Sequence, residues 1–300
     1  MASLKNWILA ARPKTLTAAV VPIFVSVCFV SYWIKKNNLP LTVEYWIPII
    51  ALLCSLMIQI ATNFYNDAID FKNGADNDKR LGPTRASHSG LISPELLMQT
   101  GHFCLFLALI MGSLLVVQGG LPILAVGVFS LFFSYAYTGG PYPLAYKGWG
   151  DFFVLLFFGW IAVAGMVHLM IGAVPFEAWV LGTQIGCLST TLIAINNYRD
   201  QITDRDVGKM TLAARFGKTF SRVEFLFLIL VPYGLSVWLM LSGHSKPGLY
   251  SILLAPVGVF LVFKMMTSLP SPELNKLLAL AALHHLLFGF MLAVGFLFSM

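Results

Sequence analysis

Two short clusters of asparagine and aspartate close apolar segments in a chain that otherwise carries little charge. The first cluster covers residues 63–70 and the second covers residues 196–204. Carboxylates at a membrane boundary are unfavourable unless a cation or a metal ion accompanies them, so we interpret both clusters as functional. Their repetition at matching ends of two hydrophobic segments makes them the strongest functional signal in the sequence.

Helical spacing would turn each cluster into a column of oxygen ligands. The residues that would form the two columns are Asn63, Asp67 and Asp70, with Asn66 beside them, and Asn197, Asp200 and Asp204. Stacked carboxylates repel one another, and a divalent cation removes that repulsion. Oxygen donors without histidine or cysteine suit Mg²⁺, which typically keeps water ligands and bridges to substrate phosphates.

Basic residues follow both clusters and could bind the charge of a diphosphate that the metal leaves uncompensated. They are Lys72, Lys79, Arg80 and Arg85 after the first cluster, and Arg199, Arg205 and Lys209 within or after the second. Each of them could equally form a salt bridge at the membrane boundary, so the basic residues are weaker evidence than the paired acidic columns. Tyr135, Tyr137 and Tyr142 could line a cavity or form an interfacial belt.

The composition indicates a membrane protein. Of the 300 residues, 58% are hydrophobic and only 11% are charged, which excludes an ordinary soluble domain. The four cysteines form no CxxC pair, which argues against a zinc site or a disulfide framework. The net charge of +6 is distributed between apolar runs, so we expect membrane lipid and no nucleic acid as a partner.

Nine segments are apolar and long enough to cross about 30 Å of hydrocarbon as helices, which predicts an all-α integral membrane fold. They are Leu16–Trp33, Trp46–Thr62, Leu97–Val117, Pro122–Thr138, Phe152–Gly172, Phe176–Ile195, Val223–Leu241, Leu249–Thr267 and Leu277–Phe298. We interpret residues 1–300 as one polytopic domain.

The distribution of basic residues predicts the orientation of the chain. With nine spans, only Lys35, Lys36 and Lys246 of the 19 lysines and arginines fall on one side. The other side would therefore be cytoplasmic, with the N-terminus inside and the C-terminus outside. Both acidic clusters, and the long loops at about 64–96 and 196–222, would then face the cytoplasm.

A secondary transporter is the alternative from another functional class. Transporter carboxylates usually lie near the bilayer midplane, often beside broken helices and inverted repeats. Here the acidic clusters lie at one face and no acid stands in the middle of a predicted span. This placement favours an enzyme that handles a cytosolic anion.

The motifs resemble the UbiA superfamily of intramembrane aromatic prenyltransferases, whose members have nine helices and two Asp-rich motifs on cytosolic loops. The matching stretches are Ala11–Leu16, Asn66–Asp76, Arg80–Arg85, Ser89–Ser93, Tyr137–Pro143, Asn196–Asp200 and Asp204–Leu212. The Arg80–Ser93 and Tyr137–Pro143 stretches resemble the branch that prenylates 1,4-dihydroxy-2-naphthoate in menaquinone synthesis.

The resemblance implies a role for most of these polar residues. The residues implied as Mg²⁺ ligands are Asn66, Asp67, Asp70, Asp76, Asp200 and Asp204, of which Asp67, Asp70, Asp200 and Asp204 would be catalytic. The expected substrate-binding residues are Arg12, Asn63, Lys72, Arg80, Arg85, Asn197, Arg199 and Lys209. Tyr142 and Lys147 are further candidates, although ubiquinone-pathway relatives carry Tyr-x-x-x-Lys here and this chain has one more residue between them.

The reaction implied by the resemblance is the Mg²⁺-dependent transfer of a polyprenyl group from polyprenyl diphosphate to 1,4-dihydroxy-2-naphthoate, with loss of CO₂, giving demethylmenaquinol. The isoprenoid tail would lie in a central apolar cavity between the helices. Other aromatic acceptors (4-hydroxybenzoate, homogentisate or a naphthoquinone) remain alternatives. We expect the chain in a bacterial cytoplasmic (inner) membrane, with its active site facing the cytoplasm.

Overall fold

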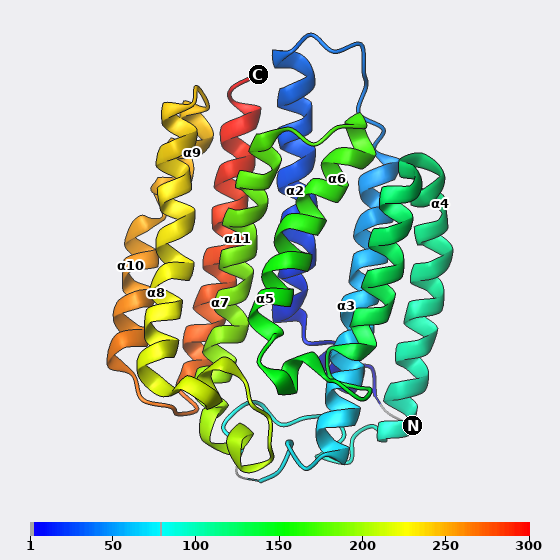
Figure 1. Cartoon of the computed structure of the whole chain (residues 1–300), viewed down its shortest axis with the longest axis vertical. Coiled ribbons are helices and arrows are strands. Elements are labelled where there is room, and N and C mark those ends of the chain that lie inside the picture. The colour runs from blue at the N-terminus through cyan, green and yellow to red at the C-terminus, as the bar shows by residue number, and fades with distance from the viewer. Residues whose placement is uncertain (1–2, 79) are drawn as a thin grey trace.

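The computed structural model describes residues 3–78 and 80–300, so Lys79, counted above among the basic residues, lies outside the described residues. Within the described ranges the chain is helical and contains no strand (Figure 1). The elements are α1 (Leu4–Ala11), α2 (Pro13–Lys36), α3 (Trp46–Lys72), α4 (Pro94–Ala136), η1 (Leu144–Lys147, a 3-10 turn), α5 (Gly150–Val154), η2 (Leu155–Ile161, a π-helical segment), α6 (Ala162–Ile171), α7 (Phe176–Asp206), α8 (Leu212–Leu241), α9 (Ser245–Ile252), α10 (Ala255–Thr267) and α11 (Leu274–Leu297).

Seven helices of the described chain are long and apolar enough to span a membrane, or eight if α9 and α10, bent by 43°, form one span. The prediction of nine separate spans is therefore not confirmed. The predicted third and fourth spans both fall on α4, whose 43 residues are interrupted at Gly120 (φ 67°, ψ −153°) just before Pro122. Figure 1 shows the two halves of α4 turning back on each other at this break.

Both acidic clusters lie on helices, as their spacing predicts. α3 continues to Lys72 and α7 to Asp206, well past the ends of the predicted spans. The clusters therefore occupy the C-terminal turns, where the helix dipole is negative and further disfavours carboxylates. Positive charge from elsewhere in the fold must compensate them.

The long α7 forms the centre of the main core, where it packs against α2, α8 and α11. It also approaches η2 closely, because Gly159 faces Gly182 and Gly186. A Cβ atom at Gly159 would lie 2.4 Å from the carbonyl oxygen of Gly182. This backbone contact fixes the α5–η2–α6 segment, and with it Asp151, against α7.

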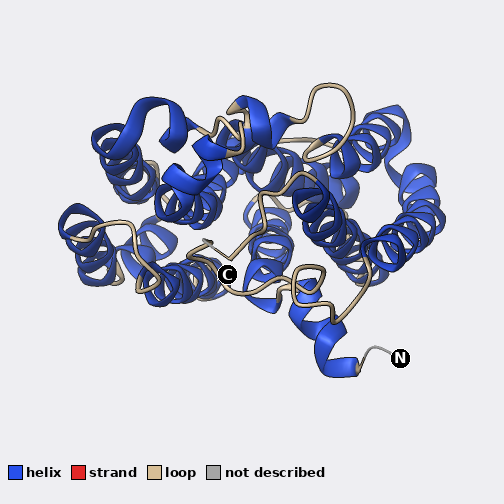
Figure 2. Cartoon of the chain, turned by 90° about the horizontal axis from the view of Figure 1, so that it is seen from below, coloured by secondary structure: helices blue, strands red, loops and turns tan. Residues whose placement is uncertain are grey.

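The loops that follow α3 and α7 gather at one end of the bundle, together with the N-terminus, while the C-terminus lies at the opposite end (Figures 1 and 2). At the same end, α1 and α2 are separated by Arg12, which adopts a left-handed conformation (φ 54°, ψ 68°). Such strain in a residue other than glycine often marks a functional position. That this end faces the cytoplasm remains a prediction.

Candidate active site

The two acidic clusters meet in one small cavity of about 100 Å³, called the polar chamber below. Its polar lining residues are Arg12, Asn66, Asp70, Arg80, Arg85, Tyr137, Thr138, Asp151, Asn196, Asn197, Asp200, Asp204, Lys209 and Thr211. They come from the ends of α3 and α7, from the loops after these helices, and from the segments before α2 and α5. Residues more than a hundred positions apart are thus brought together.

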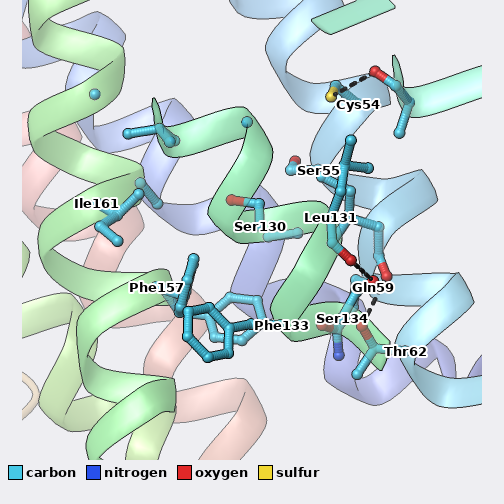
Figure 3. A pocket seen from close by; sticks show the side chains of 18 of the residues that line it. Cys54, Ser55, Gln59, Thr62, Ser130, Leu131, Phe133, Ser134, Phe157 and Ile161 are labelled. Carbon is cyan, nitrogen blue, oxygen red and sulfur yellow. Dashed lines mark hydrogen bonds between the residues drawn. The ribbon is translucent and has the colours of Figure 1, made fainter. Parts of the chain in front are cut away.

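A second cavity of about 500 Å³, the apolar cavity, extends between α2, α3, α4, α6 and α7. Figure 3 shows part of its wall, with Phe133 and Phe157 on one side and Gln59 and Thr62 of α3 on the other. The two cavities adjoin, because they share five lining residues: Arg12, Asn66, Tyr137, Ile193 and Asn196. A polar compartment opening into an apolar one suits a ligand with a charged head and a hydrocarbon tail.

Asp70 is the residue of the first cluster that is most firmly fixed in the polar chamber. Its Oδ1 accepts a hydrogen bond from the Tyr146 hydroxyl (2.8 Å), and its Oδ2 lies 3.2 Å from Lys209 Nζ. Burial disfavours the lysine cation, but Asp70 and Asp204 outweigh this effect and hold the pKa of Lys209 above its ordinary value. Lys209 therefore remains a cation beside both acidic clusters.

Asp200 and Asp204 line the chamber from α7. Asp200 accepts two hydrogen bonds from the Arg199 guanidinium (2.8 and 2.6 Å) and lies 3.7 Å from Arg80 Nη2. Arg199 itself is 1% exposed, does not line the chamber, and also donates to Asn275 (2.5 Å). The structure therefore places Arg199 as the buried counter-ion of Asp200 and not at a substrate-accessible position.

Asp67 and Asp76 do not line the chamber and instead hold the loop after α3. The Asp67 carboxylate accepts hydrogen bonds from the backbone N–H groups of Ala86 (3.0 Å) and Ser87 (2.9 Å). Asp76 pairs with Arg80 and lies 3.7 Å from Arg85 Nε. Both acids thus position the loop that carries the two arginines, and the structure does not place them at the proposed metal site.

Asp67→Asn should therefore loosen this loop more than it impairs catalysis. An amide can accept only one of the two backbone hydrogen bonds, so we expect a loss of about 1–3 kcal/mol in stability. Hydrogen exchange at Ala86 and Ser87 should accelerate, and thermal unfolding should occur at a lower temperature. A loss of turnover as large as that of Asp70→Asn, with unchanged exchange in the loop, would contradict this role.

Three arginines line the chamber: Arg12 from the turn between α1 and α2, and Arg80 and Arg85 from the loop after α3. Burial and the charges of Arg12 and Arg80 lower the pKa of Arg85 well below its ordinary value. Burial and the nearby Arg80 likewise lower the pKa of Arg12 against the opposing effect of the carboxylates. The buried Nε atoms of Arg12 and Arg85 have no hydrogen-bond partner among the described residues. Such crowded, incompletely paired guanidinium groups are suited to bind a multivalent anion.

Besides Arg199, three more of the expected substrate-binding side chains lie outside both cavities. Lys72 is half-exposed and pairs with Glu95 (3.1 Å) on the surface. Tyr142 is 57% exposed, and Lys147 Nζ lies 5.6 Å from the centre of its ring. The turn before α5 directs Tyr146 inwards instead, so Tyr142 and Lys147 form a surface cation–π contact.

The remaining expected residues lie at the cavities. Asn63 lines the apolar cavity and donates hydrogen bonds to the Ala11 carbonyl (2.9 Å) and to Thr15 Oγ1 (3.2 Å), which stabilises the turn around Arg12. Asn66 lines both cavities and accepts a hydrogen bond from Thr138.

Asp151 is a buried carboxylate of the chamber that Asn197 approaches, and it is not among the residues predicted from the sequence. The sequence did contain an indication of this residue, because Asp151 is the only acidic residue between Glu95 and Glu177 and stands at the end of a predicted span.

Tyr137 lines both cavities. Burial and the charges of Asp151 and Asp70 raise the pKa of Tyr137, so its hydroxyl keeps its proton.

The donor set of the chamber fits Mg²⁺. Asn66, Asp70, Asp200 and Asp204 present carboxylate and amide oxygens, the hard donors that this ion prefers. Among the described residues no three acidic, histidine or cysteine side chains form a metal cage by themselves. This arrangement suits an ion whose coordination is completed by water and by substrate phosphate.

Comparisons with known proteins agree with the fold and the motifs. The model of the UbiA prenyltransferase family matches residues 21–286. The chain is 31% identical over 242 residues to the 1,4-dihydroxy-2-naphthoate octaprenyltransferase of Mycobacterium tuberculosis, covering 81% of this chain and 80% of the relative. It is also 31% identical over 305 residues to the enzyme of the same name from Escherichia coli, covering 94% and 93%.

Solved structures share the fold. A UbiA homolog from Aeropyrum pernix superposes with a TM-score of 0.70 at 14% identity, covering 98% of this chain and 99% of the other. A UbiA homolog from Archaeoglobus fulgidus, bound to DMAPP and Mg²⁺, superposes with a TM-score of 0.64 at 16% identity, covering 96% and 99%. With its apolar helices and the match over residues 21–286, the chain is an integral membrane protein that belongs to the UbiA prenyltransferase family.

Proposed function

We propose that the chain transfers a polyprenyl group from polyprenyl diphosphate to 1,4-dihydroxy-2-naphthoate, with Mg²⁺ as cofactor and loss of CO₂. The observation that carries the reaction type is the junction of the two cavities, where the polar chamber adjoins the apolar cavity at Arg12, Asn66 and Tyr137. The relatives named as 1,4-dihydroxy-2-naphthoate octaprenyltransferases support the choice of acceptor.

The diphosphate would occupy the polar chamber, with the tail in the apolar cavity. Asn66, Asp70, Asp200 and Asp204 would hold Mg²⁺, which would offset the negative charge that develops as the allylic C–O bond breaks. Arg12, Arg80 and Arg85 would bind the remaining charge of the diphosphate, because all three line the same chamber and the Nε atoms of Arg12 and Arg85 have no hydrogen-bond partner among the described residues.

The allylic carbon would then lie at the junction of the cavities. Aromatic side chains such as Phe133, Phe153 and Phe157 pack against one another in the wall of the apolar cavity, with ring centroids 4.8–6.1 Å apart. This wall would keep water from the electrophile, so that the electron-rich ring of the acceptor reacts with it. We further propose that the chamber faces the cytoplasm of a bacterial inner membrane, the side from which both polar reactants come.

The test is an assay of membranes containing this chain with polyprenyl diphosphate and a panel of aromatic acceptors. We expect prenylation of 1,4-dihydroxy-2-naphthoate to a product without the carboxyl group, loss of turnover to background in EDTA, and recovery with added Mg²⁺. Membranes without the chain are the control. A product that keeps the carboxyl group, or turnover only with 4-hydroxybenzoate, homogentisate or a naphthoquinone, would contradict the proposed acceptor. Turnover that persists in EDTA would contradict the metal.

A further inference from the structure

Asp151 is the carboxylate of the polar chamber that lies beside the junction with the apolar cavity. The preceding Gly150 is packed between two junction residues. A Cβ atom at Gly150 would lie 2.9 Å from the Tyr137 hydroxyl and 3.2 Å from Ile193 Cδ1. Asp151 itself is only 5% exposed and lines the chamber. It is therefore close to the place where the allylic carbon and the acceptor ring must meet.

The surroundings of Asp151 differ from those of the acids that have cationic partners. Asp70 pairs with Lys209, and Asp200 pairs with Arg199. Among the described residues, Asp151 has no lysine, arginine or histidine within ion-pair distance, and its side-chain partner is the neutral amide of Asn197, at 3.3 and 3.5 Å. The titratable side chains on which the charge of Asp151 acts, Tyr137 and Glu224 of α8, carry no positive charge.

These contacts suit a group that accepts a proton. A carboxylate bound to Mg²⁺ or to a guanidinium is a weak base, whereas Asp151 retains its basicity and is held in place by Asn197. Tyr137 keeps its hydroxyl proton and can donate a hydrogen bond at the junction. Lys209 also acts on the charge of Asp204, so among the described residues Asp151 is the one acid of the chamber on which no cation acts.

We propose that Asp151 is the general base that removes the proton of the acceptor hydroxyl next to the attacked ring carbon. This inference rests on the proposed function, because it presupposes a hydroxylated aromatic acceptor at the junction.

The step balances without an oxidant or a reductant. The bond between the ring carbon and the allylic carbon forms while the allylic C–O bond breaks, and that electron pair leaves with the diphosphate. The hydroxyl proton passes to Asp151 and the hydroxyl oxygen becomes a ketone. A carboxylate on the attacked carbon is then β to this ketone, so it leaves as CO₂. The enolate that remains takes the proton back from Asp151, which restores the aromatic diol and the carboxylate.

The test compares Asp151→Asn with the wild-type chain, using 1,4-dihydroxy-2-naphthoate, polyprenyl diphosphate and Mg²⁺. Asparagine has the same shape and can still accept a hydrogen bond from Asn197, but it cannot take the proton. We expect kcat to fall by about 100-fold or more. The KM for the diphosphate donor and the inhibition constant of inorganic pyrophosphate should change less than about threefold, because Asp151 does not bind the donor.

Two further measurements distinguish a base from a merely structural residue. Asp151→Glu should recover part of kcat, since it restores a carboxylate. Above neutrality, the kcat of Asp151→Asn divided by the wild-type kcat should rise about tenfold per pH unit, because a growing fraction of the acceptor hydroxyl is already ionised. The rise should end once this hydroxyl is fully ionised. Glu177→Gln is the control and should keep wild-type kinetics, because Glu177 is an acid in the first turn of α7 that lines neither cavity.

The outcomes separate this inference from the proposed function. If the wild-type chain prenylates no aromatic acceptor, the proposed function fails. If the wild-type chain is active and Asp151→Asn has the same kcat, the function stands and the base assignment is wrong. A loss of pyrophosphate inhibition equal to the loss of turnover would also overturn the assignment, because Asp151 would then belong to the donor site.

Discussion

Asp70→Asn should lower turnover by about 1,000-fold while leaving the chain folded. Asp70 offers its carboxylate to the polar chamber from the last turns of α3, and an amide would be a far weaker ligand for Mg²⁺. The loss should appear in kcat for 1,4-dihydroxy-2-naphthoate prenylation at saturating donor and Mg²⁺. Asp206→Asn, an exposed acid at the end of α7 that lines neither cavity, is the matched control.

Asp70→Asn also removes the ion-pair partner of Lys209. A loss of turnover that comes from this broken ion pair must therefore be separated from one that comes from the lost metal ligand. Breaking a buried ion pair leaves one charge uncompensated, whereas replacing both partners with neutral residues is often tolerated. Asp70→Asn combined with Lys209→Met should therefore unfold closer to the wild-type temperature than Asp70→Asn alone, yet remain inactive. Recovery of turnover in the double variant would show that Asp70 acts only through Lys209.

The helical character of both acidic clusters, and their meeting at one end of the bundle, could be predicted from the sequence. Spacing alone places Asn63, Asp67 and Asp70 near one helical face. A step of four residues along a helix nevertheless rotates about 40° beyond a full turn. This rotation is enough for the residues of one cluster to face different neighbouring segments of the fold. In the structure Asn63 faces the apolar cavity, Asp67 faces the loop after α3, and Asp70 faces the polar chamber. Which segment covers which part of a helix is a tertiary property that periodicity does not contain.

Side-chain reach explains the other differences between the sequence predictions and the structure. Arg199 and Asp200 are neighbours in sequence, and successive helical residues point about 100° apart. The long arginine nevertheless curls back to bind the carboxylate with two hydrogen bonds, so it is buried as a counter-ion. In contrast, Lys209 lies far along the chain from Asp70 and still pairs with it, because the turn after α7 returns towards α3. The sequence therefore predicted that basic residues lie near the acidic clusters, but not which of them pairs with which carboxylate.

Span counting had a similar limit. Hydropathy identified the apolar stretches on either side of Gly119–Gly120, and the structure places both on α4 with a break at Gly120. The left-handed conformation of Gly120 and the following Pro122 end the first half and start the second without an intervening loop. Similarly, Arg12 divides α1 from α2 in a conformation that no hydropathy pattern predicts, since arginine rarely adopts it.

Arg85→Met should weaken donor binding while leaving the free protein as stable as the wild type, or more so. Most buried arginines are paired, and their removal destabilises the fold. Arg85 instead lies beside the like charges of Arg12 and Arg80, its Nε has no hydrogen-bond partner among the described residues, and Asp76 is 3.7 Å away. Removing this charge relieves repulsion in the free protein. It also removes a charge-assisted contact worth about 1.5–3 kcal/mol once a diphosphate is bound.

We therefore expect the KM for polyprenyl diphosphate, and the inhibition constant of inorganic pyrophosphate, to rise by about 10- to 100-fold in Arg85→Met. Thermal unfolding without ligand should occur at the wild-type temperature or above, and pyrophosphate with Mg²⁺ should stabilise the variant less than the wild type. Lys218→Met, which removes an exposed positive charge from α8, should change neither quantity. An Arg85→Met protein that unfolds early but keeps wild-type donor affinity would mean that Arg85 holds the loop through Asp76. The crowding of the three arginines would then have a structural cause.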